Sequence, residues 1–336
     1  MSKIFITGVA GFLGGHLADK MLADGHEVVG IDNMLGGESD NVNPEVEFHH
    51  VDCNEFERMK AVLKGCEIVF HCAATAYEGL SVFSPHVVTQ NVVSASVATF
   101  SAAIANGVKR IVTCSSMARY GAGAGASPFH ETDIPVPEDP YGIGKLTTEH
   151  FLKNLCDTHG VEYAIAVPHN IIGPREKYDD PYRNVASIMA NLMLQGRRPV
   201  IYGDGEQRRC FSYVDDCIYC LKEMAFRPEA VGHIINIGPD EDSVSINELY
   251  QRIANQTGFN GAPVYMADRP KEVKFATCSA DKARALLDYR TTVGLDDGLA
   301  AMIDYIRERG TRPFKYHLDL EIITDKTPKT WLNRLF

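Results

Sequence analysis

The chain has 336 residues, of which 45% are hydrophobic and 23% are charged. This composition is typical of an ordinary globular protein with a sizeable core. The formal net charge of −11 argues against nucleic acid or an anionic membrane as a partner, because such partners require a basic surface.

We find no targeting or membrane segment by inspection. Met1-Ser-Lys leads directly into the first predicted strand, which leaves no signal peptide, and no apolar run approaches the roughly 20 residues of a membrane span. Nine cysteines, an odd number spread through predicted strands and helices, suit a reducing compartment better than a disulfide framework. We therefore expect a cytoplasmic protein.

The chain opens with a strand, a glycine-rich turn and a helix. Residues 3–7 are an apolar run, Gly8, Gly11 and Gly14 follow, and apolar residues at helical spacing come next. Such a turn lets backbone N–H groups approach a pyrophosphate, and the dipole of the following helix favours the negative charge. This pattern predicts a dinucleotide site at the beginning of the chain.

The second predicted strand, residues 27–31, ends in Asp32, roughly 20 residues beyond the glycines, as in dinucleotide-binding units. A carboxylate at this position accepts hydrogen bonds from the hydroxyls of a ribose and repels a 2′-phosphate. The sequence therefore predicts NAD as the cofactor and argues against NADP.

Strand-like segments near residues 46–51, 67–72, 110–114 and 162–167 continue the alternation, with helical segments between them, notably 86–106 and 141–158. Alternation of this kind predicts an α/β protein with a Rossmann-type, doubly wound parallel sheet. We expect residues 1–169, together with about 209–238, to form this NAD-binding domain. The glycine- and alanine-rich run 121–127 is expected to be a surface loop at the mouth of the crevice, with a mobile lid as the alternative.

Beyond Asn170 the alternation loosens, and proline, arginine and glycine become frequent. This change predicts a smaller, mixed α/β substrate-binding domain of residues 170–208 and about 239–318, followed by a C-terminal tail of residues 319–336. The tail ends in four apolar residues that would dock either on the body or on a partner subunit: Trp331, Leu332, Leu335 and Phe336.

The other cysteines and histidines give no sign of a metal site. Cys217 and Cys220 form the one C-x-x-C pair, which falls in a predicted helix and has no second pair to complete a ligand set. His49, His50 and His71 border predicted strands, where we expect packed or hydrogen-bonded rings. We predict no bound metal.

Tyr141 and Lys145 lie four residues apart in a predicted helix and therefore share one face. A free phenol has a pKa of about 10, so a tyrosine acts as a base at neutral pH only if a nearby cation favours its ionised form. Lys145 would supply that cation. Ser115 and Ser116 end the strand 110–114, where a hydroxyl could orient a substrate alcohol; for Ser115 we prefer a turn residue.

These segments resemble the extended short-chain dehydrogenase/reductases, and specifically the NAD-dependent nucleotide-sugar epimerases and dehydratases typified by UDP-galactose 4-epimerase. The resemblance covers nearly the whole chain except residues 311–336. The matching stretches are Thr7 to Gly14, Gly30-Ile-Asp32-Asn33, Val51-Asp52, His71-Cys-Ala-Ala74, Asn91, Cys114 to Gly121, Tyr141 with Lys145, His169 to Pro174 and Gly203 to Phe211.

The resemblance implies roles for individual residues. Catalysis would fall to Ser116, Tyr141 and Lys145. The cofactor would be held by Gly8, Gly11, Phe12, Leu13, Gly14, Asp32, Asn33, Asp52, Cys53, Ala73, Ala74, Asn91, Tyr141, Lys145 and Pro168. The sugar nucleotide would be held by Ser116, Asn170, Asn184, Tyr202, Arg209 and Arg269.

Two of the substrate-binding assignments have alternatives. The planar fork of an arginine suits a diphosphate, because it donates two parallel charge-assisted hydrogen bonds. Arg209 fits that role, but Arg269 could equally form a surface salt bridge. Asn170 could tie a loop to itself.

By resemblance, such an enzyme oxidises the 4-hydroxyl of a nucleotide sugar to a 4-ketose, with Tyr141 removing the proton. Dehydratases of the family carry an Asp-Glu pair before the tyrosine of the x-Y-G stretch, decarboxylases a glutamate, and 3,5-epimerases a cysteine. This chain has Met117-Ala118-Arg119 there. The remaining simple outcome is 4-epimerisation, in which the trapped ketose turns over and is reduced on its other face.

Several alternatives stay open. A ketoreductase or dehydrogenase would use the same three residues, a 3,5-epimerase or dehydratase would need a further acid or base, and an NAD sensor would lack catalysis. We expect a UDP-hexose or its N-acetyl form as substrate, or a UDP-uronic acid if Arg119 points into the sugar pocket. Of the two orientations of Arg119 we prefer the outward one, which would give it no role in substrate choice. The resemblance further implies a homodimer in which segments 86–106 and 141–158 of both subunits pack as a four-helix bundle.

Overall fold

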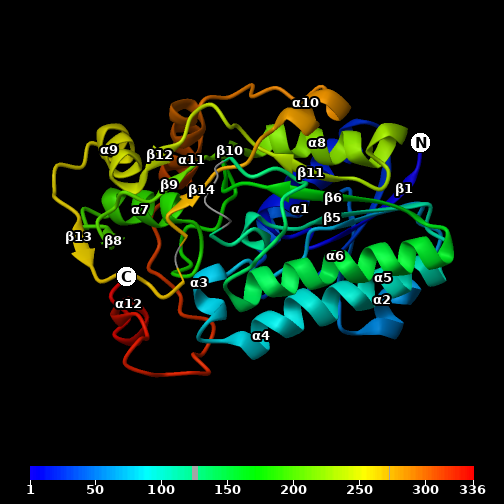
Figure 1. Ribbon diagram of the computed structural model, residues 1–336, viewed down its shortest axis with the longest axis horizontal. Coiled ribbons are helices and arrows are strands. Elements are labelled where there is room, and N and C mark those ends of the chain that lie inside the picture. The colour runs from blue at the N-terminus through cyan, green and yellow to red at the C-terminus, as the bar shows by residue number, and fades with distance from the viewer. Residues whose placement is uncertain (123–127, 272) are drawn as a thin grey trace.

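The computed structural model of the chain describes residues 1–122, 128–271 and 273–336 (Figure 1). Most of the glycine- and alanine-rich run 121–127 therefore lies outside the described residues. The centre of the molecule is a seven-stranded sheet in the order β11-β6-β5-β4-β1-β2-β3, with every neighbouring pair parallel. Its strands are β1 (Lys3–Thr7), β2 (Glu27–Asp32), β3 (Glu47–His50), β4 (Ile68–His71), β5 (Arg110–Cys114), β6 (Glu162–Pro168) and β11 (Ile234–Ile237). The predicted doubly wound α/β fold is confirmed.

Helices cover both faces of this sheet (Figure 1). On one face α1 (Phe12–Ala23) packs against α8 (Val214–Phe226), and on the other α5 (Ala95–Ala105) packs against α2 (Phe56–Val62) and α6 (Pro140–His159). Side chains alternate between the two faces along a strand. Ile4 and Ile6 accordingly join the core under α1 and α8, whereas Phe5 joins the core under the other three helices.

Local sequence explains where helix α6 begins and ends. The carboxylate of Asp139 caps the helix by accepting a hydrogen bond from the N–H of Gly142 at 2.9 Å. Pro140 occupies the first turn, where its missing N–H has no helical partner in any case. The helix ends at Gly160, which adopts φ = 69° in the left-handed region that glycine tolerates. This fixed start places Tyr141 and Lys145 on the first turns.

A second group of elements lies beyond the carboxyl ends of the sheet strands. Its hydrophobic core gathers α7 (Val185–Leu194), α9 (Ile246–Thr257) and α11 (Leu295–Arg309). The short strands pair around it as β10 (Ser212–Tyr213) with β7 (Ile171–Ile172), β13 (Val264–Met266) with β8 (Val200–Tyr202), and β9 (Arg208–Arg209) between β12 (Val244–Ser245) and β14 (Phe275–Ala276). Helix α10 (Asp281–Leu287) packs near α8 and β11.

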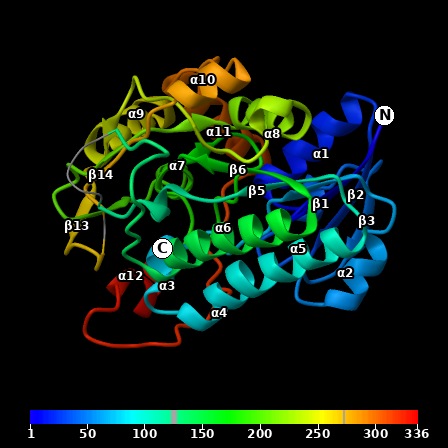
Figure 2. The same ribbon diagram turned by 45° about the vertical axis from the view of Figure 1, so that its right-hand side comes forward.

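The C-terminal segment runs along this second group and ends in α12 (Lys329–Leu332), which Figures 1 and 2 place beside α3 (Glu78–Ser81). Trp331 is buried there with Tyr77, Leu80, Phe83 and Tyr182. The sequence left open whether the tail docks on the body or on a partner subunit. Trp331 docks on the body. Leu332 and Leu335 stay exposed.

The expectation that no apolar segment reaches the length of a membrane span is wrong. Among the described residues, one helix of 21 residues, Pro85–Ala105, is long and apolar enough to cross a membrane, judged by length and composition alone. It comprises α4 (Pro85–Thr89), a π-helical turn (Gln90–Ser94) and α5, and its inner face packs on α2 and α6. Packing in the protein core accounts for only part of that apolar composition, because 44% of the apolar window is buried.

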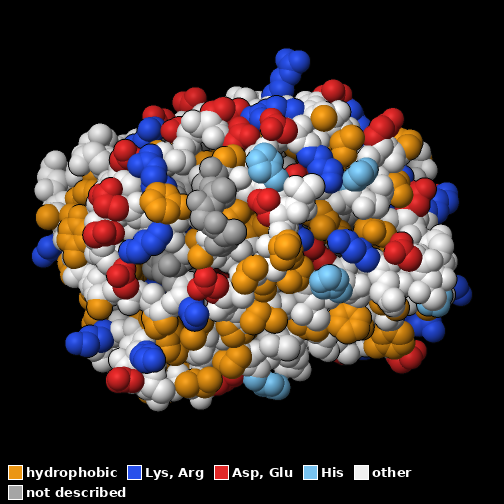
Figure 3. All heavy atoms as spheres, in the orientation of Figure 1, with side chains coloured by type: hydrophobic (Ala, Val, Ile, Leu, Met, Phe, Trp, Pro, Cys, Tyr) orange, Lys and Arg blue, Asp and Glu red, His pale blue; other side chains and the backbone are white. Residues whose placement is uncertain are grey.

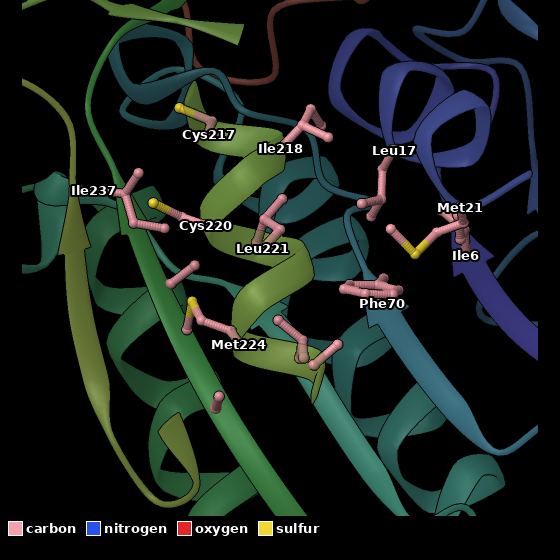
Figure 4. Packing of buried hydrophobic residues seen from close by; sticks show 14 of the residues in the cluster. Ile6, Leu17, Met21, Phe70, Cys217, Ile218, Cys220, Leu221, Met224 and Ile237 are labelled. Carbon is pink, nitrogen blue, oxygen red and sulfur yellow. The ribbon is translucent and has the colours of Figure 1, made fainter. Parts of the chain in front are cut away.

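The C-x-x-C pair lies in the apolar core between α8 and the sheet. Figure 4 shows Cys217 and Cys220 on α8 beside Ile218, Leu221 and other apolar side chains. Both thiols are buried, and burial raises the pKa of each. Among the described residues no group of histidine, cysteine, aspartate and glutamate is arranged to hold a metal ion.

Candidate active site

A cavity of about 480 Å³ opens at the carboxyl ends of β1, β2, β4, β5 and β6. Ligands of open parallel sheets bind at this edge, where the strand order reverses between β1 and β4. Every residue predicted from the sequence to bind cofactor or substrate lines this cavity. The structure thus brings together segments from the first glycines to Arg269.

The glycine turn forms one wall of the cavity, and its geometry excludes side chains. Gly8 has φ = 72°, and a Cβ there would come within 2.9 Å of the Cα of Ala73. At Gly14 a Cβ would lie 2.1 Å from the carbonyl oxygen of Gly8. Phe12 and Leu13 begin helix α1 directly after this turn. The bare backbone forms a cradle at a helix N-terminus, as a pyrophosphate requires.

Asp32 lies at the end of β2 and is only 8% exposed. Its two carboxylate oxygens accept hydrogen bonds from the N–H groups of Ala10 (3.1 Å) and Met34 (2.8 Å). Burial raises the pKa of Asp32, and these two N–H groups oppose the shift by stabilising the charge. The hydrogen bonds hold the carboxylate at the position predicted for a ribose-binding acid.

Asn33 and Asp52 are joined side by side on the same wall. The Asn33 amide donates to Asp52 Oδ2 at 2.6 Å, and the N–H of Asn54 donates to Asp52 Oδ1 at 2.7 Å. Burial would raise the pKa of Asp52, but these hydrogen bonds outweigh it and hold the pKa below its ordinary value. The adjacent Cys53 is a neutral thiol, because burial raises its pKa to about 12.

The remaining predicted cofactor residues complete this half of the cavity. Ala73 and Ala74 follow β4, and the N–H of Ala73 donates to Thr7 Oγ1 at 3.2 Å. Asn91 lies in the π-helical turn between α4 and α5 and donates to the carbonyl of Val87 at 2.9 Å. Pro168 ends β6. Single π-helical turns are frequent at functional sites, and this one directs Asn91 to the cavity.

Tyr141, Lys145 and Ser116 lie close together in the lining of the cavity. The ammonium of Lys145 lies 5.8 Å from the centre of the Tyr141 ring and donates to the carbonyl of Cys114 at 2.7 Å. Ser116 caps the short turn after β5 and is a hydrogen-bond partner of the Tyr141 phenol. Both Tyr141 (7% exposed) and Lys145 (4% exposed) are buried.

The expected electrostatic effect of Lys145 on Tyr141 does not dominate. Burial raises the pKa of Tyr141 above that of a free phenol, and the hydrogen bond from Ser116 is the main opposing contribution. Burial likewise lowers the pKa of Lys145, because it destabilises the charged ammonium relative to the neutral amine. Desolvation thus penalises the charge on both side chains. That Lys145 supplies the cation for a Tyr141 phenolate stays a prediction.

Arg119 points away from the cavity. Its guanidinium forms a bidentate ion pair with Glu149 on α6, and Ser115 donates a hydrogen bond to the same carboxylate. Arg119 does not line the cavity, so it does not face a bound sugar. This agrees with the outward orientation. Ser115 is the structural serine that we preferred.

The predicted substrate residues line the other half of the cavity. Asn184 caps helix α7 through a hydrogen bond from the N–H of Ala186 (3.1 Å), and Asn170 donates to the carbonyl of Cys210 at 2.9 Å. Asn170 thus ties two distant loops together, rather than one loop to itself as the alternative from the sequence had it. Arg209 donates to the carbonyl of Val273 at 2.7 Å, and the guanidinium of Arg269 lies 4.8 Å from the centre of the Tyr202 ring.

The structure adds residues to the cavity that the sequence did not indicate. Tyr77 and Glu78 enter from α3 and the segment before it, and Trp331 and Phe336 enter from the tail. The negative charge of Glu78 contributes to the raised pKa of Tyr141, which places this carboxylate within electrostatic reach of the phenol. No recognisable motif marks these residues, since only the tertiary fold brings them here.

His71 is a buried structural residue. Its two ring nitrogens form hydrogen bonds with Thr7 Oγ1 and Ser96 Oγ, both at 2.8 Å. Burial lowers its pKa to about 3, so the ring is neutral. The expectation of a hydrogen-bonded histidine is confirmed.

Comparison with known proteins agrees with this geometry. A family described as the NAD dependent epimerase/dehydratase family matches residues 4–238. The chain belongs to this family. A UDP-glucose 4-epimerase of Mycolicibacterium smegmatis is 30% identical over 319 residues, which cover 91% of this chain and 99% of that protein.

Solved structures of epimerases have the same fold. A UDP-glucose 4-epimerase of Thermotoga maritima with UDP-glucose superposes with a TM-score of 0.87 and 30% identity, over 91% of this chain and 99% of that one. A UDP-glucuronic acid 4-epimerase of Bacillus cereus with UDP-glucuronic acid and NAD gives 0.84 and 28%, over 92% and 100%. The cofactor of this epimerase/dehydratase family member is NAD, as predicted from Asp32. The side-chain-free glycine cradle and the buried Asp32 carboxylate fit that dinucleotide.

Proposed function

We propose that this protein is an NAD-dependent nucleotide-diphosphate-sugar 4-epimerase. The observation that carries the proposal is the meeting of Ser116, Tyr141 and Lys145 in the cavity that also holds the glycine cradle and Asp32. A UDP-hexose, a UDP-N-acetylhexosamine and a UDP-uronic acid are the candidate substrates, in line with the relatives named above. Because Arg119 is paired with Glu149, it gives no reason to prefer the uronic acid.

In the proposed mechanism, Tyr141 as phenolate accepts the proton of the sugar 4-hydroxyl, and Ser116 orients that hydroxyl by hydrogen bonding. Lys145 keeps its position through the Cys114 carbonyl and stabilises the phenolate when it forms. NAD, when bound, supplies the acceptor for the hydride of C4 and returns that hydride later. Tyr141 then gives its proton back to the oxygen of the reduced sugar.

Epimerisation requires that the ketose turns over without leaving the cavity. We propose that Arg209 and Arg269 hold the diphosphate during this step, because the sugar itself has lost a hydrogen-bond donor. Asn170, Asn184 and Tyr202 would line the path between nucleotide and sugar. The cavity wall around them would exclude water from the ketose.

Glu78 is a candidate for the further acid or base that the alternative reactions need, because it lines the cavity within electrostatic reach of Tyr141. A second acid near the sugar would permit a dehydratase or 3,5-epimerase to act after the 4-ketose forms. If Glu78 has such a role, the Glu78→Gln variant will stop the later product and accumulate the ketose. If the protein is a 4-epimerase, the variant will still form the C4 epimer. A ketoreductase or dehydrogenase is the remaining alternative, since it uses the same three central residues.

We further propose a cytoplasmic homodimer. The apolar side chains Ile143 (51% exposed) and Phe151 (42% exposed) lie on the outer face of α6, and Figure 3 shows apolar side chains over the lower face where α4 and α6 lie. Pairing of helices 85–105 and α6 with those of a second subunit, as a four-helix bundle, would bury this face. The division into an NAD-binding domain, a substrate domain and a tail is likewise a proposal. The separate core of α7, α9 and α11 supports it, although α10, from the proposed substrate domain, packs in the core under the sheet.

One experiment separates the candidate functions. The protein is incubated with a panel of UDP-, GDP- and dTDP-sugars, and the products are identified by NMR. Formation of a C4 epimer without net change in the cofactor's redox state supports the 4-epimerase. Stoichiometric consumption of reduced cofactor would indicate a ketoreductase, and tight NAD binding without turnover would indicate a sensor.

A further inference from the structure

The C-terminal segment forms part of the cavity although it lies outside the family resemblance. The matches to the two epimerase structures above cover 99–100% of those chains but only 91–92% of this one. A portion of this chain therefore has no counterpart in them. Trp331 and Phe336, near the end of the segment, line the cavity together with the proposed substrate residues.

Several hydrogen bonds fix the segment to the body before it reaches the cavity. The carboxylate of Glu321 accepts from the N–H groups of His86 and Val87 at the start of α4, both at 2.8 Å. Ser84 donates to the carbonyl of Asp319 at 3.1 Å. Figure 2 shows the segment running beneath α3 and α4. It is therefore an anchored part of the fold.

The indole of Trp331 is held from several sides. Its Nε1–H donates to the carbonyl of Pro181 at 3.3 Å. Its ring meets the rings of Tyr182 and Phe83 edge to face, with centres 5.5 and 6.0 Å apart. Such pairs favour a defined orientation of each ring. Only 5% of Trp331 is exposed.

Thr330 and Trp331 lie beside Tyr202 and Arg269 on one side of the cavity. The hydroxyl of Thr330 hydrogen-bonds that of Tyr202, and the guanidinium of Arg269 lies 4.8 Å from the centre of the Tyr202 ring. Arg269 and Trp331 both flank Gly79, where a Cβ would lie 3.2 Å from Arg269 Nη1 and 3.5 Å from Trp331 Cη2. The tail therefore contacts Tyr202 directly, and Tyr202 in turn contacts Arg269.

From these contacts we propose that Thr330 and Trp331 are positioning residues for the nucleoside-diphosphate part of the substrate. Thr330 holds Tyr202 in place, Tyr202 supports Arg269, and Trp331 with Phe336 closes this side of the cavity. The inference rests on the proposed function, which assigns Tyr202 and Arg269 to the nucleotide sugar. A fixed guanidinium binds a diphosphate more strongly than a mobile one, because less side-chain freedom is lost on binding.

The test measures binding of UDP to the full chain by calorimetry, with NAD binding as the control for folding. We expect Trp331→Ala to weaken UDP about tenfold, as removal of a buried aromatic at a binding site typically does. Trp331→Phe should recover most of the affinity, since it keeps an aromatic ring. Leu332→Ala is the matched control, because Leu332 is 40% exposed and does not line the cavity.

A second variant covers the case in which Trp331→Ala fails to fold. Thr330→Val keeps the shape but removes the hydrogen bond to Tyr202, and should weaken UDP about threefold relative to Thr330→Ser. In turnover assays both effects should be in KM with kcat nearly unchanged. Unchanged UDP affinity in Thr330→Val and in folded Trp331→Ala overturns the inference. Failure of the unmodified protein to bind UDP would instead contradict the proposed function itself.

Discussion

Arg119 and Glu149 form a buried bidentate ion pair directly behind the candidate active site. The Nε–Oε1 and Nη2–Oε2 distances are 2.8 and 3.0 Å, and the two side chains are 4% and 1% exposed. Glu149 lies one helical turn after Lys145 on α6, and Ser115 donates to the same carboxylate. The pair therefore connects the end of β5 to the helix that carries Tyr141.

Breaking this pair should strongly destabilise the protein, because it leaves an uncompensated charge in the core. We expect Glu149→Gln to lower the free energy of unfolding by about 3–5 kcal/mol, measured by urea denaturation. The double variant Arg119→Met/Glu149→Leu, which removes both charges, should be considerably more stable than Glu149→Gln. A loss below about 1 kcal/mol in the single variant, the range of exposed pairs, would show that the pair is not buried in solution.

Replacement of Tyr141 by phenylalanine removes the proposed base without changing the packing of the ring. We expect kcat to fall by about 10²- to 10⁴-fold, the usual contribution of a positioned acid–base group. Affinity for NAD should change little. Ser116→Ala, which removes only the orienting hydroxyl, should have a smaller effect on kcat. Similar kcat values for Tyr141→Phe and the unmodified enzyme would exclude this tyrosine as the base.

The raised pKa of Tyr141 gives a defined pH dependence. Only the phenolate can accept the sugar proton, and burial keeps the phenol protonated at neutral pH. The kcat/KM for the sugar nucleotide should therefore increase with pH through the neutral and mildly alkaline range. A flat profile, measured at saturating NAD, would mean that another group limits the proton transfer.

Glu176 should make stability depend on pH in the opposite direction from a carboxylate whose pKa is lowered by an ion pair. Burial raises its pKa to about 8, so between about pH 4.5 and 8 the folded chain binds more protons at this group than the unfolded chain. Its contribution makes the free energy of unfolding fall as pH rises through that window. Glu176→Gln should flatten this slope, measured by urea denaturation at several pH values. An identical slope in the variant would contradict the burial of the charge.

Asp32 should determine the choice between the two dinucleotides. Asp32→Asn removes the charge that repels a 2′-phosphate and weakens the acceptor for the ribose hydroxyls. We expect NAD to bind about tenfold more weakly and the preference for NAD over NADP to shrink. Calorimetry with both dinucleotides checks the ratio, with Asp304→Asn, which neutralises an exposed aspartate outside the cavity lining, as the control. An unchanged ratio would remove Asp32 from cofactor selection.

Local motifs made much of this site predictable from the sequence. The glycine turn, Asp32 and the Tyr141/Lys145 pair each depend on a few neighbouring residues, so spacing alone indicated their positions. The six parallel strands up to residue 168 followed from alternating patterns in the same way. All these features concern residues that are close in the sequence.

Features that depend on distant contacts were not predictable in this way. The orientation of Arg119 depends on Glu149, thirty residues away, and the entry of Glu78 and Trp331 into the cavity depends on how whole segments pack. The pKa of Tyr141 depends on burial, which raises it despite the hydrogen bond with Ser116. The apolar character of the helix Pro85–Ala105 was underestimated, because polar residues interrupt its apolar residues and leave no continuous apolar run.

The most direct test of the central claim follows the hydrogen on C4 of the sugar. UDP-glucose carrying deuterium at C4 is incubated with the enzyme and NAD, and the C4 epimer is examined by NMR. Transient oxidation at C4 in a closed cavity predicts an epimer that keeps the deuterium at C4. An epimer with solvent hydrogen at C4 would contradict the account, as would the absence of any C4 epimer across the UDP-hexose, UDP-N-acetylhexosamine and UDP-uronic acid substrates.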